Sequence, residues 1–302
     1  MYWRAGPSRR SIALKPAPFD YVRPASVREA CGILAEAGGG ATVIAGGQTL
    51  MPLLNLRMSQ PFILVDIAGI EDIQGVSAVP GGLRVGAMTR QADGLTDALL
   101  AARLPAMVMA LEHVGHHQTR NRGTVGGSIA LGEPAAEMPA TAVALGATME
   151  IASLRGIRQV AAADFYLGPY MTALEPDELL TGVIYPHWPE GHLVLFREVA
   201  RRPGDFALLG MTGAAVLENG AVARIGLAWF GMGPTPIRMV QAENALLGQA
   251  LTDIDPDTVA RLAVADAAPF DDHHVSAEYR RTVGHRIFRR TLREAFGLKE
   301  AA

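Results

Sequence analysis

The residues of this 302-residue chain that are best suited to chemistry are paired glycines set among hydrogen-bonding side chains. The first pair lies in the segment Ala45-Gly46-Gly47-Gln48-Thr49-Leu50, directly after a short apolar run. Because glycine has no Cβ, backbone N–H groups in such a segment can converge on an anion such as a pyrophosphate. A tight turn in which a glycine adopts a positive φ explains the same residues without any ligand. From the first segment alone, we favour this turn over an anion-binding site.

A second segment of the same character contains Thr124-Val125-Gly126-Gly127-Ser128. Two such segments, each followed by a side chain able to donate to a phosphate, predict two walls of one site for a dinucleotide-like ligand. The Rossmann pattern Gly-x-Gly-x-x-Gly is absent, since Pro234 and Pro236 stand where a helix would have to follow Gly231-Met232-Gly233. A phosphate-binding loop that ends in Gly-Lys is absent from the sequence as well.

Other conspicuous side chains have simpler interpretations. His113, His116 and His117 are spaced to share a helical face that could hold a metal, but Gly115 interrupts the helix and no carboxylate or cysteine completes the set. We interpret them as polar loop residues and expect no metal site. Glu137 lies in the expected first turn of a helix, where an acid stabilises the helix dipole by about 0.3–1 kcal/mol. No catalytic triad or glycosidase carboxylate pair stands out, so we expect no catalytic side chain here.

The amino-acid composition excludes several kinds of partner and of chemistry. The chain has 27 Lys and Arg against 30 Asp and Glu, a net charge of −3, which excludes a nucleic-acid partner held by charge. Lys15 and Lys299 are its only lysines, which argues against lysine chemistry. Cys31 is the only cysteine, so this chain can neither form an intrachain disulfide nor ligate an iron–sulfur cluster of its own.

Residues 1–16 are predicted to be a leader. Ser8 to Lys15 resembles a twin-arginine export signal, but Pro16, Pro18 and Asp20 stand where the apolar part of such a signal should be. No window of 18 residues is both uncharged and strongly apolar throughout. We therefore expect a cytoplasmic location and no membrane insertion.

Helices and strands alternate along the predicted fold. A capping box at residues 26–29 begins a helix that ends at Gly38, and Asn219-Gly220 predicts a hairpin. Further strands are expected at 42–44, 62–65, 82–88, 179–184, 192–199, 211–217 and 222–230, and further helices at 50–58, 101–114, from Pro134, and at 237–247, 257–267 and 276–296. Residues 115–127 are expected to form a long loop. We therefore expect a first domain over 17–177 and a second over 178–302.

Four segments together resemble the FAD-binding medium subunits of the molybdenum hydroxylases, the family of xanthine dehydrogenase and carbon monoxide dehydrogenase. They are Ala45 to Arg57 continuing to Leu64-Val65-Asp66-Ile67, Arg120 to Ala130 continuing to Pro134-Ala135-Ala136-Glu137, Gly168 to Leu180, and Arg202-Pro203-Gly204-Asp205-Phe206-Ala207. The resemblance covers residues 17 to about 295, in the order that the family has.

The resemblance implies an α+β protein: an FAD-binding domain of the vanillyl-alcohol-oxidase (PCMH) type with two α/β subdomains, followed by a smaller α+β C-terminal domain. It also implies which residues bind the cofactor. Two loops would hold the FAD pyrophosphate, Glu137 would lie near the flavin and its ribityl chain, Leu180 would touch the isoalloxazine, and Arg197 would occupy a basic flavin-side position. The loop residues are Ala45, Gly46, Gly47, Gln48, Thr49 and Leu50 in the first, and Thr124, Gly126, Gly127 and Ser128 in the second.

The function implied by the resemblance is that of an oxidoreductase subunit. FAD in this chain would accept electrons from [2Fe-2S] clusters of a small subunit and pass them to an external acceptor. A large subunit with a molybdopterin cofactor would hydroxylate the substrate, and the assembly would be a dimer of heterotrimers. Family members specialised for carbon monoxide commonly carry histidine where this chain has Gln48, which favours an aldehyde or an N-heterocycle. A free-standing FAD-dependent oxidase of the same domain class and a non-enzymatic scaffold are the alternatives.

Overall fold

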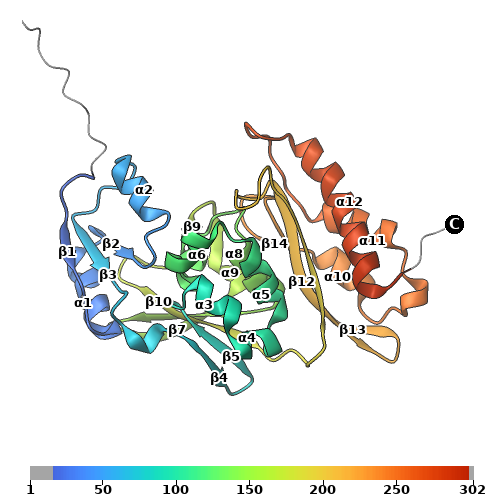
Figure 1. The fold of residues 1–302 in the computed structure, drawn as a ribbon, viewed down its shortest axis with the longest axis horizontal. Helices are drawn as coiled ribbons and strands as arrows, with labels where there is room; N and C mark the ends of the chain where they lie inside the picture. Colours follow the sequence, from blue (N-terminus) through green and yellow to red (C-terminus); the bar gives the residue numbers. More distant parts are fainter. Residues whose placement is uncertain (1–15, 299–302) are drawn as a thin grey trace, which may run out of the picture.

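The structure is a computed structural model that describes residues 16–298. The segment Ser8 to Lys15, which resembles an export signal, lies outside the described residues. Three units follow one another along the chain, and Figure 1 shows them side by side. Within residues 16–298, no helix is both long enough and apolar enough to span a bilayer.

The first unit is a small parallel sheet with two helices. Its three strands pair in the order β1-β3-β2, and their register is parallel throughout. Helix α1 begins where Ser26 accepts a hydrogen bond from the Glu29 N–H at 3.2 Å and ends at Gly38, whose φ of 54° is left-handed. The elements are β1 (Asp20–Val22), α1 (Val27–Ala37), β2 (Ala41–Ile44), α2 (Leu50–Asn55) and β3 (Ile63–Asp66).

The second unit is an antiparallel sheet with helices on one face. The strands pair in the order β4-β5-β10-β6-β7. They are β4 (Val76–Val79), β5 (Gly82–Gly86), β6 (Thr148–Ser153), β7 (Gly156–Ala161) and β10 (Leu179–Pro186). The helices are α3 (Gln91–Thr96), α4 (Ala98–Arg103), α5 (Pro105–His113), α6 (His117–Arg122), α7 (Val125–Leu131), α8 (Glu137–Ala144) and α9 (Ala162–Phe165), and the short pair β8 (Tyr166–Gly168) and β9 (Met171–Thr172) follows α9.

The third unit is a four-stranded antiparallel sheet, ordered β11-β12-β13-β14, with three helices on one face. The tight turn at Asn219 and Gly220, with φ of 51° and 78°, joins its two long strands, as the sequence predicts. The elements are β11 (Leu193–Val199), β12 (Leu209–Glu218), β13 (Ala221–Phe230), β14 (Ile237–Arg238), α10 (Val240–Leu246), α11 (Pro256–Ala265) and α12 (Ala277–Phe296).

Helices α5 and α8 pack between the antiparallel sheets of the second and third units. All eight residues of α8 are buried, and one core joins side chains of α5 and α8 to Ala214, Ala228 and Phe230 of the third unit. The Thr141 hydroxyl lies 3.3 Å from that of Thr212, which ties α8 to β12. The second and third units are therefore held together by a closely packed apolar interface.

Gly226 on β13 provides a test of that interface. A Cβ on this residue would lie 2.0 Å from the Ala144 carbonyl oxygen. We expect Gly226→Ala to lower the free energy of unfolding by about 1–3 kcal/mol, because neither backbone can move without disturbing its sheet or helix. Urea denaturation measures this loss. Gly32→Ala in α1 is the control, since its Cβ would meet no atom within 4 Å, and alanine there should stabilise the helix.

Several expected elements differ from the structure. The expected loop at 115–127 is wrong, because α6 and α7 fill it: Thr124 caps α7, and Gly126 and Gly127 lie in the helix. The helix expected from Pro134 begins at Glu137, and the one expected from Ile237 begins at Val240, after β14. Strand β10 belongs to the sheet of the second unit, so we propose that the domain boundary follows Pro186 instead of residue 177.

Candidate functional site

The structure brings the two glycine segments into contact. A Cβ on Gly46 would lie 2.3 Å from the Arg122 carbonyl oxygen and 2.8 Å from the Gly123 Cα. A Cβ on Gly127 would lie 3.7 Å from that of Ala45. The connection between β2 and α2 therefore packs directly against the start of α7, and glycine at position 46 is required for this close approach.

The first segment presents a row of unused backbone donors. Within the described residues, the N–H groups of Gly46 to Leu50 donate no hydrogen bond to another protein atom. The Gln48 side chain donates to the Gly46 carbonyl at 3.1 Å, which holds the turn closed, and Gly47 has a left-handed φ of 72°. Consecutive N–H groups on one turn that lack protein partners suit the oxygens of an anionic group.

The second segment uses its donors internally. The Gly126 N–H donates to the Ala87 carbonyl at 2.9 Å, and the Gly127 N–H donates to the Thr124 hydroxyl at 3.0 Å. A Cβ on Gly126 would lie 2.4 Å from that of Ala87, so packing alone demands glycine there. This segment therefore forms a rigid wall, while the first segment supplies the free N–H groups. The sequence pattern, which treats the two Gly-Gly pairs alike, could not show this difference.

Neighbouring residues hold that wall in place. The Gln91 N–H donates to the Gly123 carbonyl and the Val125 N–H to the Thr89 carbonyl, both at 3.0 Å. The Arg90 guanidinium also donates to the Arg122 carbonyl. Sequence reasoning missed residues 87–91, because their contribution comes mostly from backbone groups, which leave no signature in the residue types.

Glu137 is buried at the first turn of α8, with 4% of its surface exposed. Burial raises the pKa of its carboxyl from 4.5 to about 8, its own backbone N–H opposes the shift, and the nearby carboxylates Glu198 and Glu133 raise it further. Capping alone does not explain this arrangement, because an acid that only complements a helix dipole is usually solvated and ionised. A buried acid with a strongly shifted pKa marks a candidate functional group.

This carboxyl predicts how stability depends on pH. Between pH 4.5 and about 8 the folded chain holds a proton on Glu137 that the unfolded chain has released. The free energy of unfolding of the FAD-free chain should therefore fall as the pH rises through this window, by up to about 1.4 kcal/mol per unit. Urea denaturation of wild type and Glu137→Gln over this range measures the effect, and the variant should show a flatter profile. Identical profiles would mean that the folded chain already ionises Glu137.

Leu180 and Arg197, which are predicted to contact the flavin, both pack against other protein side chains. Leu180 on β10 is buried in the core that also contains Val125 and Ile129 of α7, so it lies behind the wall of the site. Arg197 on β11 donates to the Thr291 hydroxyl at 3.0 Å and pairs with Glu294, so its side chain faces α12. The structure does not bring Arg197 together with the glycine segments, and its flavin contact stays a prediction. The roles of the other predicted site residues stay predictions as well.

The three histidines point to different partners. The His113 ring lies 4.5 Å from that of Phe196, His116 packs against Gly204, and His117 lies 3.3 Å from the Asn121 amide. Within residues 16–298, no group of three or more His, Cys, Asp or Glu side chains is arranged to hold a metal ion.

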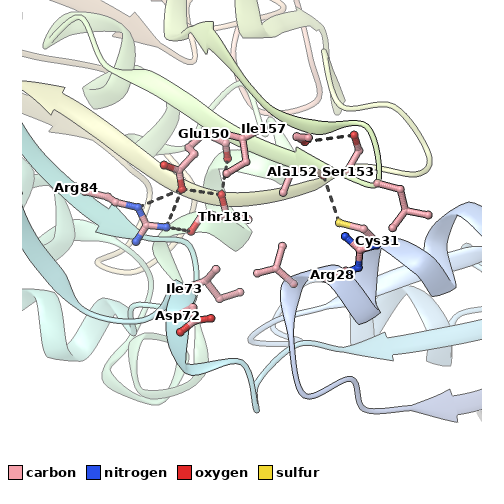
Figure 2. Close-up of a pocket in the computed structure, with 13 residues that line it drawn as sticks. Arg28, Cys31, Asp72, Ile73, Arg84, Glu150, Ala152, Ser153, Ile157 and Thr181 are labelled. Atoms are coloured by element: carbon pink, nitrogen blue, oxygen red, sulfur yellow. Dashed lines mark hydrogen bonds and ion pairs between the residues drawn. The ribbon is translucent and has the colours of Figure 1, made fainter.

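Two cavities border the second unit, one apart from the glycine segments and one next to the connection before α8. Figure 2 shows one of about 370 Å³ between α1 and the antiparallel sheet of the second unit. Arg84, Glu150 and Thr181 point toward one another in it, with Arg84 and Glu150 paired at 2.8 Å, so these groups satisfy each other. Both side chains lie on the sheet face opposite the helices, because alternate residues of β5 and β6 enter the helix-covered core. This cavity is therefore separate from the glycine segments.

The larger cavity, of about 690 Å³, separates the connection before α8 from the third unit. Its wall includes Glu133 to Ala135, just before the buried Glu137, and the exposed aromatic side chains of Tyr170 and Phe206. Tyr170 donates to the Glu133 carboxylate across one side. The cavity therefore opens beside the connection that leads into α8, two residues before Glu137.

Comparison with known proteins adds independent findings. Two protein-family models match the chain. The family described as "FAD binding domain in molybdopterin dehydrogenase" matches residues 17–188, and the family described as "CO dehydrogenase flavoprotein C-terminal domain" matches residues 194–295. The 6-hydroxypseudooxynicotine dehydrogenase complex subunit alpha of Paenarthrobacter nicotinovorans is 38% identical, over 93% of this chain and 96% of that protein. The nicotine 6-hydroxylase medium subunit of the same organism is 34% identical, over 93% and 99%.

A solved structure agrees in fold. Carbon monoxide dehydrogenase from Hydrogenophaga pseudoflava, in a form that lacks the molybdenum-pyranopterin moiety of its cofactor, superimposes on this chain with a TM-score of 0.90. The sequence identity is 34%, and the match covers 93% of this chain and 98% of that one.

Proposed function

Since this chain belongs to the family of FAD-binding medium subunits of molybdenum hydroxylases, we propose that it is the electron-transferring flavoprotein of a three-subunit complex. In this proposal FAD accepts electrons from [2Fe-2S] clusters on a small subunit and passes them to an external acceptor, while a large molybdopterin subunit hydroxylates the substrate. The predicted family, the α+β fold class with an FAD-binding domain and a C-terminal domain, and the oxidoreductase class are confirmed.

The observation that carries the proposal is that the N–H groups of Gly46 to Leu50 have no partner among residues 16–298, while their loop packs against the start of α7. Each donor to a charged oxygen contributes about 1.5–3 kcal/mol, so several of them suit a pyrophosphate. Bound FAD supplies the redox chemistry, while the protein holds and orients it. In this chain the first segment binds the phosphates, α7 fixes their distance from the second unit, and Glu137 provides a buried proton-binding group.

The partners follow from what this chain lacks. Its only cysteine, Cys31, is buried and donates to the Ala152 carbonyl, so an iron–sulfur relay must come from another polypeptide. We propose a small [2Fe-2S] subunit, a large molybdenum subunit and a dimer of such heterotrimers, located in the cytoplasm. The external acceptor is NAD, a quinone, a carrier protein or dioxygen, and in this proposal the larger cavity gives it a route toward the flavin.

The substrate proposed for the complex is an aldehyde or an N-heterocycle. Gln48 replaces the histidine expected for the carbon monoxide branch. The two relatives from Paenarthrobacter nicotinovorans are named for 6-hydroxypseudooxynicotine and nicotine, and nicotine is an N-heterocycle. The relatives do not separate a heterocycle from carbon monoxide, since the nicotine 6-hydroxylase medium subunit and the carbon monoxide dehydrogenase structure are both 34% identical to this chain. This part of the proposal therefore rests on Gln48.

The absorption spectrum of the purified full chain tests the central part of the proposal. We expect the visible bands of an oxidised flavin at about one FAD per chain, bleached by dithionite and restored by air. A chain that folds, shown by circular dichroism, yet neither copurifies with FAD nor binds added FAD would contradict the proposal and leave the scaffold alternative.

A further inference from the structure

A second acid faces Glu137 from the third unit. Glu198 lies on β11 two residues after Phe196, and Phe196 packs against the core shared with α5 and α8. Since side chains alternate along a strand, residues 196 and 198 share this face, whereas Arg197 faces α12. Within the described residues, the buried Oε2 of Glu198 has no hydrogen-bond partner. A buried oxygen without a hydrogen-bond partner destabilises the fold and calls for an explanation.

The charged groups around this acid come from three elements. Helix α8 contributes Glu137, α5 contributes His113, and the connection before α8 contributes Glu133, which acts on Glu137. The Nδ1 of His113 donates to the Met109 carbonyl at 3.0 Å. On the opposite face of β11, Arg197 is engaged with Glu294.

No cation neutralises the two acids. Within residues 16–298, neither Glu137 nor Glu198 forms an ion pair with an arginine, although the chain is rich in arginines and pairs many of its other acids. Glu137 is buried, Glu198 is partly buried with an inaccessible Oε2, and the charge of Glu198 raises the pKa of Glu137. Two carboxylates that act on each other in this way repel when both are charged, which favours a proton on one of them.

We propose that Glu137 and Glu198 act as one proton-storing pair, which takes up a proton when the flavin is reduced and releases it when the flavin is reoxidised. This inference rests on the proposed function. Two electrons from the partner's iron–sulfur clusters and one proton from solvent convert FAD to its reduced anion, and a second solvent proton binds the carboxylate pair and balances the remaining charge. When the external acceptor removes the two electrons, the proton on the flavin leaves with them as a hydride or passes to solvent, and the proton on the carboxylate pair returns to solvent.

The titration range of the two acids fits this role. Burial raises the pKa of Glu198 to about 7, with His113 opposing the shift, and burial raises the pKa of Glu137 to about 8. Groups that titrate near neutral pH can gain and lose a proton in each turnover. A negative charge on the reduced flavin would raise both values further and so drive proton uptake.

The dependence of the flavin potential on pH tests the pair. In the FAD-loaded full chain at about neutral pH, we expect the wild type to take up about two protons per two electrons, and Glu198→Gln to take up about one. Glu198→Asp should recover most of the uptake, because it keeps the carboxyl. The control is Glu218→Gln, at the exposed end of β12, which should match wild type. Equal uptake in Glu198→Gln and wild type, at equal FAD content, would overturn the proposal.

A second measurement tests the pair without FAD, so that it also applies to variants that lose the cofactor. Infrared spectra of the FAD-free full chain at about pH 7 should contain the C=O band of a protonated carboxyl, and Glu137→Gln and Glu198→Gln should each weaken it. If neither substitution changes this band, the proposed proton-storing pair is wrong, even where loss of FAD prevents the measurement of the flavin potential. Failure of the proposed function is distinct, because it shows as a wild-type chain that binds no FAD at all.

Discussion

Replacing Gly47 with valine is expected to lower the FAD content of the purified chain by about tenfold to a hundredfold, whereas valine at Gly75 should leave it unchanged. Each hydrogen bond to a charged phosphate oxygen contributes about 1.5–3 kcal/mol, and about 1.4 kcal/mol is a factor of ten in affinity. A branched side chain at Gly47 both blocks the approach of the phosphate and strains the turn that aims the N–H groups from residue 46 to residue 50.

Gly75 is a matched control because the two glycines share one backbone conformation. Gly47 has φ of 72° and Gly75 has φ of 74°, so valine is strained to a similar extent at both positions. A Cβ at Gly75 would meet no atom within 4 Å, whereas one at Gly47 would lie 3.3 Å from the flexible side chains of Ile44 and Met51. Both variants should lose comparable stability, measured by thermal unfolding, and only Gly47→Val should lose flavin absorbance.

The pair of variants therefore separates the two interpretations of the first glycine segment. If Gly47 serves only a tight turn, both chains retain FAD in proportion to the folded protein recovered. If it serves a phosphate, the flavin-to-protein ratio falls in Gly47→Val alone. Gly127→Val would be a poorer probe, because its Cβ would lie 2.7 Å from the Thr124 hydroxyl and would break the cap of α7 before it met a ligand.

Features set by neighbours in the sequence could be predicted from the sequence alone. The Ser26 cap, the Gly38 stop and the hairpin at Asn219-Gly220 each depend on a few adjacent residues, and the structure confirms all three. Helices α6 and α7 were missed because their glycine and asparagine content favours loops, and tertiary packing overrides that preference: Gly126 is in the helix because its backbone must pass close to Ala87.

The surroundings of site residues depend on contacts between distant parts of the chain, which sequence patterns do not encode. Arg197 donates to Thr291, 94 positions away, and this partner on α12 could not be found from the family pattern. Glu198 is its neighbour in sequence, yet it faces the buried Glu137 from the opposite side of β11. One signal was present in the sequence: the alternation of Leu195, Phe196, Arg197 and Glu198 puts an acid on the same strand face as a large aromatic residue.

The second large effect concerns the whole complex: expressed alone, this chain should bind FAD but oxidise no aldehyde or N-heterocycle. Substrate hydroxylation would take place at a molybdenum cofactor on another polypeptide, and within the described residues no metal-binding group of side chains exists. One buried cysteine cannot replace the missing iron–sulfur relay. The isolated, FAD-loaded chain should show at most a slow transfer of electrons from an artificial donor to a dye.

Coexpression with a large molybdenum subunit and a small [2Fe-2S] subunit from the same source should restore turnover by several orders of magnitude, because the rate of the isolated chain is expected to be at the background level. Size exclusion should show the three polypeptides in one complex, and a mass corresponding to two copies of each would support the dimer of heterotrimers. Gly47→Val provides the matched complex, since the large subunit should still reduce the clusters of the small subunit while transfer to the external acceptor stops. An isolated chain, verified free of molybdenum and iron, that oxidised a heterocycle as fast as the complex would instead establish a free-standing flavin oxidase, and the larger cavity beside Glu133 and Tyr170 would then be the place to seek its substrate.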